Sequence, residues 1–387
     1  MAYLGMDLSA LTQKYAIHTA REISQQPDLW LSVWKGIDQQ RPALEHFLQK
    51  AFSDSERIIL TGAGTSAFIG LSLKGILRRR TGILTEAIAT TDLVSHPKDY
   101  FQSEIPTLLI SFARSGNSPE SVAVISLANE ICETCYHLVI TCNADGRLAK
   151  HAAEKNKYVL ALPPEANDQS LAMTSSYTGM LLAGVLVAYL NEFETTKKSV
   201  EVLIGYGRKI IKYYSGELAN IAEKNFSRAV FLGSGPFFGT AKEAHLKLQE
   251  LTDGQVICKE DSFLGFRHGP KAVVDNATLV CYIFSNEEYA SKYEKDLVNS
   301  MKKGRTPLVE IGVMENKIPG IRLDHIFYLS DNGIRLEEEF LAICSVLPAQ
   351  ILGFYKSLQL GLRPDTPSAT GAITRVVEGV RIYDLKI

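Results

Sequence analysis

Short apolar runs followed by small or polar residues recur through the middle of the chain. Residues 57–61, Arg-Ile-Ile-Leu-Thr, precede a glycine turn and a segment with helical periodicity that continues to about Arg80. Similar apolar runs at 108–111, 138–141 and 158–162 alternate with helical stretches. Strands that alternate with helices predict an α/β fold with a parallel, doubly wound sheet.

The same order of elements begins again in the second half of the chain. The run Ala229-Val-Phe-Leu-Gly233 leads into a glycine turn and a helix, and 171 residues separate Gly62 from Gly233. The apolar run 279–285 then repeats the strand that enters Ser111. An internal duplication, and therefore a second α/β domain, is the simplest interpretation.

The first fifty residues have a helical pattern of mixed polarity. Trp30 and Trp34 are four residues apart, so they lie on one helical face. We interpret these tryptophans as packing anchors for the N-terminal segment, not as a ligand platform.

Composition narrows the class of protein. The 387 residues include 41 basic and 43 acidic side chains, so the near-neutral charge gives no electrostatic footprint for nucleic acid. No uninterrupted apolar run approaches the roughly 18 residues of a membrane span, and the N-terminal residues lack the pattern of a signal peptide. A cytoplasmic enzyme without membrane or nucleic-acid partners is the expectation.

Cysteine and histidine spacing gives no sign of a metal site. The six cysteines are scattered, and Cys132-Glu-Thr-Cys135 has no second pair to complete a zinc site. The eight histidines show no HExxH or comparable ligand spacing. We therefore expect Cys132 and Cys135 to be structural and predict no metal.

A serine-rich loop follows the apolar run 108–111. Residues 111–121, Ser-Phe-Ala-Arg-Ser-Gly-Asn-Ser-Pro-Glu-Ser, place three hydroxyls and Gly116 where a helix begins at Pro119. A helix N-terminus favours an anion, and no GxxxxGK[ST] lysine is present for a nucleotide triphosphate. The loop predicts a cradle for a phosphate monoester, and an ordinary serine cap is the alternative.

The corresponding loop of the second half is acidic. Ser285-Asn-Glu-Glu-Tyr289 stands where the first half has Arg114-Ser-Gly-Asn-Ser118. Carboxylates would repel a phosphate, so only the first half keeps a full anion loop.

The second half instead concentrates ionisable groups. Glu243, Lys247 and Glu250 share one face of the predicted helix after Gly235. His268 follows in a loop between glycine and proline residues. A glutamate and a histidine form a plausible acid/base pair, whereas a solvated salt-bridge stripe beside a surface histidine is the alternative.

Together these motifs resemble a known family. Gly62-Ala-Gly-Thr-Ser66, Ser115-Gly-Asn-Ser118, the segment 243–250 and Arg267-His-Gly-Pro270 resemble tandem sugar-isomerase (SIS) domains, as in the isomerase half of glucosamine-6-phosphate synthase. With Ala172-Met-Thr-Ser-Ser176 and the tail segment 364–371, nearly the whole chain resembles the bacterial galactosamine-6-phosphate deaminase family, also labelled tagatose-6-phosphate ketose/aldose isomerase.

The resemblance implies a domain plan. We expect an N-terminal helical segment at 1–48, a phosphate-binding SIS domain at 49–200, a SIS domain with the catalytic glutamate and histidine at 201–355, and a tail at 356–387. In related SIS proteins the histidine comes from the neighbouring subunit, so a homodimer or higher homo-oligomer is implied.

The resemblance also implies roles. Glu250 would move a proton between C1 and C2 of the open-chain sugar, His268 would assist ring opening, and Lys247 and Glu243 would orient or stabilise charge. The residues implied to bind the 6-phosphate and nearby hydroxyls are Thr65, Ser66, Arg114, Ser115, Asn117 and Ser118, with Thr174 and Ser175 closing the pocket. No cofactor is needed, because hydrogen moves within one molecule.

Two departures from the synthase bear on the reaction. The chain begins Met1-Ala-Tyr, without a nucleophilic cysteine or glutaminase domain, and Lys386 does not match the synthase's terminal lysine motif. Without an internal ammonia supply, hydrolytic deamination of galactosamine 6-phosphate to tagatose 6-phosphate and ammonia is favoured. An isomerase acting on an unaminated hexose 6-phosphate and a non-catalytic phosphosugar sensor remain as alternatives.

Overall fold

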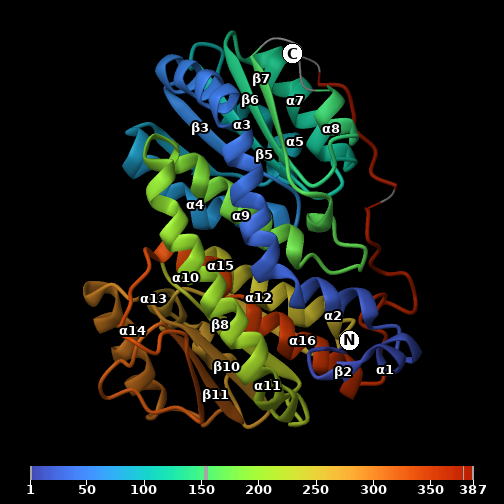
Figure 1. Cartoon of the computed structure of the whole chain (residues 1–387), viewed down its shortest axis with the longest axis vertical. Coiled ribbons are helices and arrows are strands. Elements are labelled where there is room, and N and C mark those ends of the chain that lie inside the picture. Colours follow the sequence, from blue (N-terminus) through green and yellow to red (C-terminus); the bar gives the residue numbers. More distant parts are fainter. Residues whose placement is uncertain (1, 152–155, 378, 386–387) are drawn as a thin grey trace. The chain divides into compact units, whose positions relative to one another are not determined.

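The computed structural model describes residues 2–151, 156–377 and 379–385. The chain divides into two compact units, each built on its own sheet. The first-sheet unit contains Leu29–Asp168, Ser175–Lys197 and Ile373–Ile387. The second-sheet unit contains Met1–Asp28, Gln169–Thr174 and Lys198–Ala372. Figure 1 labels many of the elements of the two units, which are described separately below.

The first sheet has five parallel strands in the order β4-β3-β5-β6-β7. They are β3 (Arg57–Thr61), β4 (Leu84–Ala87), β5 (Thr107–Ala113), β6 (Cys135–Thr141) and β7 (Lys157–Ala161). Every residue of β3, β5 and β6 is buried, which explains why these strands are continuous apolar runs in the sequence.

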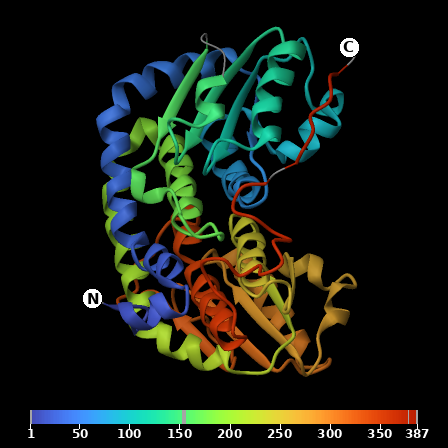
Figure 2. The ribbon, with the colours of Figure 1, turned by 90° about the vertical axis from the view of Figure 1, so that its right-hand side faces the viewer.

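Helices cover both faces of this sheet (Figure 2). They are α3 (Gln26–Asp54), α4 (Thr65–Thr81), α5 (Thr90–Ser95), α6 (Pro97–Tyr100), α7 (Pro119–Ile131), α8 (Arg147–His151) and α9 (Ser175–Ala188), with short 3-10 turns η1 (Pro164–Ala166) and η2 (Leu190–Thr195). Helix α4 packs against α9, and α5 packs against α7. The predicted doubly wound arrangement is confirmed for this unit.

The second sheet also has five parallel strands, in the order β12-β11-β10-β8-β9. They are β8 (Arg228–Leu232), β9 (Ile257–Asp261), β10 (Thr278–Ile283), β11 (Val309–Met314) and β12 (His325–Tyr328). In both sheets the first strand in sequence lies between the second and the third. The two sheets therefore share one topology, in which the strand order reverses beside the first strand.

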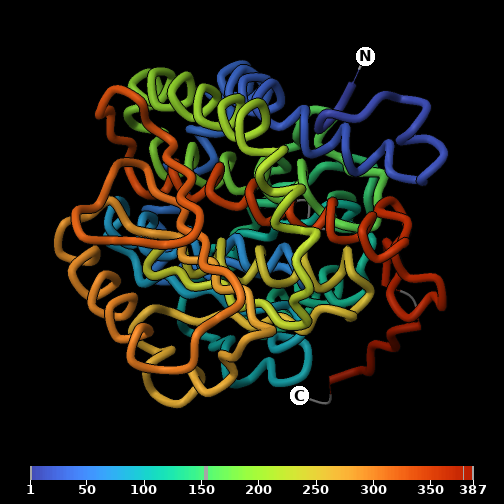
Figure 3. The backbone as a smooth tube through the Cα atoms, turned by 90° about the horizontal axis from the view of Figure 1, so that it is seen from below, coloured from blue at the N-terminus to red at the C-terminus, as the bar shows by residue number. Residues whose placement is uncertain are grey.

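The remaining elements belong to the second-sheet unit, except for the first two residues of α10, which belong to the first-sheet unit. They are β1 (Ala2–Tyr3), β2 (Met6–Asp7), α1 (Leu8–Gln13), α2 (Ile17–Ser24), α10 (Thr196–Lys209), the π-helical turn η3 (Ile210–Tyr214), α11 (Ser215–Ala222), α12 (Phe237–Leu251), α13 (Phe263–Phe266), η4 (Pro270–Val273), α14 (Glu288–Met301), α15 (Glu338–Cys344) and α16 (Leu347–Gln359). The backbone trace shows α1 and α2 as short helices near the N-terminus (Figure 3). A small antiparallel hairpin, β1–β2, precedes them and was not predicted.

The tryptophan anchors are placed as expected. The Trp30 side chain is fully buried, and Trp34 stacks on Phe193 with ring centroids 5.1 Å apart. The indole N–H of Trp34 donates to Thr196 Oγ1 at 2.9 Å, so the polar atom of this side chain is satisfied. Both side chains therefore act in packing.

Among the residues that the structure describes, one apolar stretch has the length and composition of a membrane span. It runs from Glu338 to Gln359, across α15 and α16, and 89% of its apolar window is buried within the fold. Burial of this kind also occurs in the core helices of globular proteins.

Two glycines allow the close approach of a strand to the following helix. A Cβ built on Gly62 would lie 2.6 Å from the carbonyl carbon of Ser66, and one on Gly233 would lie 2.3 Å from the Phe237 carbonyl oxygen. These backbone atoms cannot move without displacing the first turn of α4 or α12. Glycine is therefore required at both turns.

We expect Gly62→Ala to lower the free energy of unfolding by about 1–3 kcal/mol, because the added methyl overpacks the turn. Gly205→Ala, in α10 with open space around its Cβ position, is the matched control. The control should gain about 0.5–1 kcal/mol from better helix propensity. Urea unfolding of both variants measures the difference, and equal midpoints would contradict the steric argument.

Candidate active site

The serine-rich loop connects β5 to α7 and is braced by the next loop of the sheet. The Asn143 side-chain amide donates to the Ser115 carbonyl at 3.0 Å, and the Asn117 amide oxygen accepts from the Arg147 N–H at 3.1 Å. Gly116 has a φ of +65°, a left-handed conformation that glycine adopts without strain. The loop is thus held in one shape before any ligand arrives.

Ser118 is the N-cap residue of α7, and its side chain makes no capping hydrogen bond. The alternative of an ordinary serine cap is therefore wrong for Ser118. Pro119 occupies the first helical position, and the start of α7 faces the loop with its positive dipole end. This arrangement suits an anion bound by the loop.

Thr65 and Ser66 form the first turn of α4, after Gly64, and both are buried. Nearby in the fold, three polar atoms lack a hydrogen-bond partner within the described residues. They are Thr61 Oγ1 at the end of β3, Thr90 Oγ1 after β4 and Glu120 Oε2 in the first turn of α7. Buried polar atoms without a partner are rare, and these three are available to hydrogen-bond a ligand. All lie at the carboxyl ends of the strands, the usual ligand edge of such a sheet.

Arg114 follows β5 directly and is 7% exposed. Its guanidinium donates to the carbonyl oxygen of Arg375 in the tail. The Arg375 guanidinium in turn donates to Asn167 Oδ1 at 3.0 Å and to the Asp168 carbonyl. The tail thus contacts Arg114, a residue that the family resemblance assigns to phosphate binding. Arg114 and Arg375 are 261 residues apart in the sequence.

Thr174 and Ser175 are both fully buried at the start of α9. The Ser175 N–H donates to Asp168 Oδ1 at 3.0 Å, and Ser176 donates to Asp168 Oδ2 from its N–H at 2.9 Å and from its hydroxyl at 2.5 Å. The Asp168 carboxylate therefore occupies the anion position at the N-terminus of this helix. This cap fixes the Thr174–Ser175 backbone.

The ionisable face of α12 lies inside the second-sheet unit. Glu243 and Lys247 are fully buried, whereas the Glu250 side chain is 23% exposed. Lys247 Nζ lies 2.5 Å from Glu250 Oε2 and 3.4 Å from Glu243 Oε1. The alternative of a solvated stripe is wrong, because one buried cation joins two carboxylates. Only Glu250 presents its carboxylate to solvent, where a substrate can reach it.

His268 lies in the turn after α13, where its backbone N–H donates to the Gly265 carbonyl oxygen at 3.0 Å. Its side chain is exposed, and no hydrogen bond or ion pair in the described part of the chain links it to the α12 cluster. Gly269 follows with a φ of +114°, which only glycine adopts readily.

The predicted structural role of the cysteine pair fits its surroundings. Cys132 follows α7 and Cys135 begins β6, and both are buried free thiols. Burial raises the pKa of each thiol above its usual range, which makes the thiolate needed for zinc binding unfavourable.

Comparison with known proteins places the chain in a family. The SIS domain family matches residues 51–190. D-galactosamine-6-phosphate deaminase AgaS of Shewanella sp. (strain ANA-3) is 41% identical over 384 residues, which cover 98% of this chain and 95% of that protein. The chain belongs to the AgaS family.

Solved structures agree with the AgaS assignment. A protein from Clostridium novyi NT has the same fold with a TM-score of 0.95, at 39% identity over 100% of both chains. Tagatose-6-phosphate ketose/aldose isomerase from Escherichia coli gives a TM-score of 0.85 at 36% identity, over 96% of this chain and 97% of that one. The α/β fold with two parallel sheets, as in tandem SIS domains, is thus confirmed.

This AgaS-family chain fills the second loop with its own carboxylates. The Ser285 N–H donates to Glu294 Oε2 at 2.9 Å, and the Ser285 hydroxyl donates to Glu338. The Asn286 side chain donates to Glu315 Oε2 at 2.6 Å. Protein carboxylates thus occupy the donors that a phosphate would need, in keeping with the prediction that only the first loop binds an anion.

The pKa shift of Glu294 makes the free energy of unfolding depend on pH. Burial, opposed by the Ser285 N–H and reinforced by Glu338, raises the pKa of Glu294 to about 8. Between the unfolded pKa of about 4.5 and this value, the Glu294 carboxyl group is protonated in the folded state and ionised in the unfolded state. Stability from this group is therefore full below the unfolded pKa of about 4.5 and is lost as pH rises through about 8.

We expect Glu294→Gln to flatten the fall in unfolding free energy between pH 5 and 8, since one such group contributes up to about 1.4 kcal/mol per pH unit. Urea midpoints at several pH values measure the slope for both proteins. The same slope in wild type and variant would show that Glu294 does not carry this proton.

Sequence analysis missed Arg375, Asp168 and the orphan hydroxyl of Thr61. Thr61 had a signal, because it ends the strand before the first glycine turn. The sequence held no such signal for Arg375, because its contact with Arg114 depends on how the tail folds back onto the first-sheet unit. Lys386 lies outside the described residues.

Proposed function

We propose that this protein is an amino-sugar-phosphate deaminase that converts galactosamine 6-phosphate and water to tagatose 6-phosphate and ammonia. The main observation is the α12 cluster, in which buried Lys247 holds Glu250 as the single solvent-reaching carboxylate. A proton-transfer base is what an aldose–ketose interconversion needs and a sensor does not. We propose galactosamine 6-phosphate as the amino sugar because the chain belongs to the AgaS family.

The phosphate end of the substrate is assigned to the first-sheet unit. Ser115 and Ser118 would donate hydroxyl hydrogens, and the start of α7 would contribute its positive dipole end. Thr65, Ser66 and Asn117 would bind the remaining phosphate oxygens or neighbouring hydroxyls. Arg114 would add a cation, provided that the tail carbonyl shares its guanidinium.

Proton transfer is assigned to Glu250. After ring opening, assisted by His268, the Glu250 carboxylate would take the C2 proton of the open-chain aldose and give an enolamine. The same carboxyl group would return the proton to C1, which leaves an imine at C2. Lys247 would keep Glu250 oriented and Glu243 would balance the charge of Lys247.

Water completes the reaction. It adds to the C2 imine carbon, and the carbinolamine then breaks its C–N bond to release ammonia and leave the ketone. The balance is one water consumed and one ammonia released, with no change in overall oxidation state. No redox cofactor or metal enters these steps. We further propose that the protein acts as a homodimer or higher homo-oligomer in the cytoplasm, where phosphosugars are its substrates.

An assay for ammonia tests the proposal. Purified protein is incubated with galactosamine 6-phosphate, glucosamine 6-phosphate and galactose 6-phosphate, and both ammonia and ketose phosphate are measured. Ammonia should appear with the galacto amino sugar in a one-to-one ratio to ketose. Ketose formation from galactose 6-phosphate, without ammonia from either amino sugar, would support the isomerase named by the Escherichia coli structure instead.

A further inference from the structure

Arg375, in the C-terminal tail, makes hydrogen bonds to two parts of the first-sheet unit that lie far from it in the sequence. Its backbone carbonyl oxygen accepts from the guanidinium of Arg114, the residue at the start of the serine-rich loop. Its side chain donates from Nε to the Asp168 carbonyl oxygen at 3.0 Å and from a terminal nitrogen to Asn167 Oδ1 at 3.0 Å. One tail residue therefore joins the serine-rich loop to the segment at 167–168.

The anchor point of the Arg375 side chain is firmly fixed. Asp168 is fully buried, and its carboxylate accepts from the N–H groups of Ser175 at 3.0 Å and Ser176 at 2.9 Å. These bonds attach Asp168 to the first turn of α9, in which residues 175–187 are all buried. Because the Arg375 guanidinium has two acceptors on this segment, it holds the backbone of the tail close to it.

The tail is attached to the first-sheet unit at a second point. Leu385 packs against the apolar cluster that contains Val124 and Leu127 of α7. Figure 2 shows the tail, in red, running along this unit toward the C-terminus. The contacts of Arg375 therefore belong to an attached segment and not to an isolated chain end.

Arg114 is the buried end of this connection. It follows β5 directly and is 7% exposed, so its guanidinium needs hydrogen-bond acceptors within the protein. A carbonyl oxygen is a neutral acceptor, so the bond to Arg375 fixes the guanidinium without cancelling its charge. Fixing a long side chain before a ligand arrives also removes part of the entropic cost of binding.

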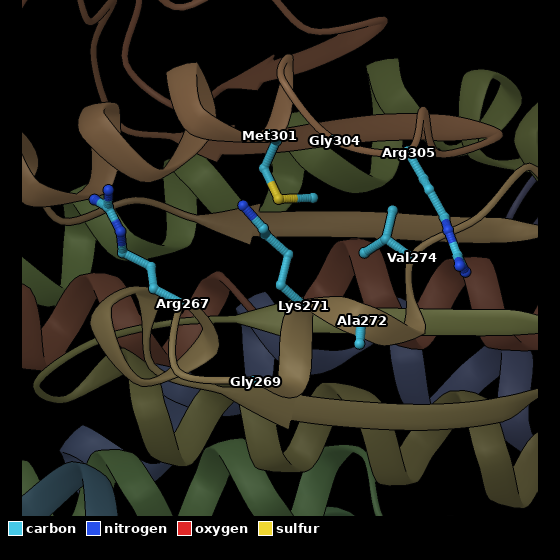
Figure 4. Close-up of a pocket in the computed structure, with 8 residues that line it drawn as sticks. All are labelled: Arg267, Gly269, Lys271, Ala272, Val274, Met301, Gly304 and Arg305. Atoms are coloured by element: carbon cyan, nitrogen blue, oxygen red, sulfur yellow. The ribbon is translucent and has the colours of Figure 1, made fainter.

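Two arginines of the second-sheet unit show the opposite arrangement (Figure 4). Arg267 and Arg305 lie at opposite ends of a pocket of about 370 Å³, and their guanidinium groups point away from one another. Both residues are exposed. An exposed guanidinium stays hydrated and samples many rotamers, and it loses that freedom when an anion binds. Arg114 differs because it is buried and already held.

We propose, on the basis of the phosphate-binding role proposed above for Arg114, that Arg375 is a positioning residue for the phosphosugar. Its side chain anchors the tail on Asn167 and Asp168, and its carbonyl oxygen then holds the Arg114 guanidinium in place before the substrate arrives. Arg375 acts through Arg114 and not through a contact with the substrate. Loss of the side-chain anchor frees the tail backbone and weakens phosphosugar binding, whereas proton transfer by Glu250 is unaffected.

Arg375→Ala tests this role in the full-length protein. Calorimetric titration with galactitol 6-phosphate, which has no carbonyl group to react, should show a Kd three- to tenfold above wild type. The loss is modest because Arg375 is exposed and its hydrogen bonds compete with water. The KM for galactosamine 6-phosphate should rise to the same extent, and kcat should stay within twofold of wild type. Thermal unfolding checks that the fold is retained.

Arg381→Ala is the matched control for Arg375→Ala. Arg381 is an exposed arginine of the same tail, and its guanidinium lies 5.0 Å from the ring centre of Tyr383. Its replacement removes the same charge from the same segment without touching the anchor at 167–168. The Kd for galactitol 6-phosphate should stay within twofold of wild type, so a larger loss in Arg375→Ala reports the anchor and not the net charge.

The Arg114→Ala background shows whether Arg375 acts through Arg114. In that background Arg375→Ala should change the Kd by less than twofold, because the guanidinium that the tail holds is absent. An equal three- to tenfold loss in both backgrounds would overturn the proposal, as would an unchanged Kd for Arg375→Ala alone. A lower Kd for Arg375→Ala would also overturn it, because the tail would then compete with the phosphate for Arg114.

The titration distinguishes failure of this proposal from failure of the proposed deaminase activity. Wild-type protein that binds galactitol 6-phosphate but releases no ammonia from galactosamine 6-phosphate would contradict the deaminase activity alone, and the Kd values would still decide the role of Arg375. Absence of galactitol 6-phosphate binding to wild type would overturn both proposals.

Discussion

Replacement of Glu250 by glutamine is expected to lower kcat for ammonia release by about 10²–10⁴-fold, the usual contribution of a positioned general base. Glutamine has nearly the same shape as glutamate, and it can still accept a hydrogen bond from Lys247, so the helix and the substrate contacts should persist. It cannot take the C2 proton. Steady-state kinetics should therefore show a lost kcat, and direct titration should show phosphosugar affinity within a few fold of wild type.

Glu201→Gln is the matched control for this experiment. Glu201 is an exposed glutamate in α10 of the same unit, and its replacement removes one carboxylate without touching α12. Its kcat should remain at the wild-type value. Strong residual activity in Glu250→Gln, with a stable fold, would show that another group removes the proton.

The central strands were predictable because their surroundings are simple. Strands β3, β5 and β6 are buried throughout, so every residue in them is selected for apolar character and the run is visible in the sequence. Strands β4, β9, β11 and β12 were not predicted. Most positions in Ile257–Asp261 are only partly buried, and three of its five side chains are charged, so hydropathy carries little strand signal there.

The candidate site was predictable in its residue types but not in its environment. Helical spacing alone puts Glu243, Lys247 and Glu250 on one face, and the structure confirms that they meet. Spacing does not reveal whether that face is buried, because burial of α12 depends on its packing against α16, about a hundred residues away in the chain. For the same reason, the contact of Arg114 with the tail could not be foreseen.

The two serine loops show how one topology supports different chemistry. Both follow the third strand of their sheet, yet the first leaves the start of α7 without a side-chain cap, and the second directs its donors to Glu294 and Glu338. A loop whose donors are already satisfied gains little from an external phosphate. The sequence prediction that the second loop does not bind phosphate is consistent with these contacts, although Glu294 and Glu338 lie outside the motif itself.

Lys247→Met is expected to lower the free energy of unfolding by about 3–5 kcal/mol, the usual effect of removing one partner from a buried ion pair. Lys247 is fully buried, and its ammonium is the cation that contacts both Glu243 and Glu250. Methionine keeps most of the side-chain volume, so the loss reports the uncompensated charge and not a cavity. Urea unfolding measures it.

Two further variants make this result decisive. Lys198→Met removes an exposed lysine from α10 and should change stability by less than about 0.5 kcal/mol. The double variant Glu243→Gln/Lys247→Met removes the fully buried carboxylate together with its cation and should recover part of the lost stability, because Glu250 alone reaches solvent. Ammonia release should remain low in the double variant, since Glu250 has lost the group that orients it. Equal stability of Lys247→Met and the double variant would mean that the buried charge of Glu243 is balanced by something other than Lys247.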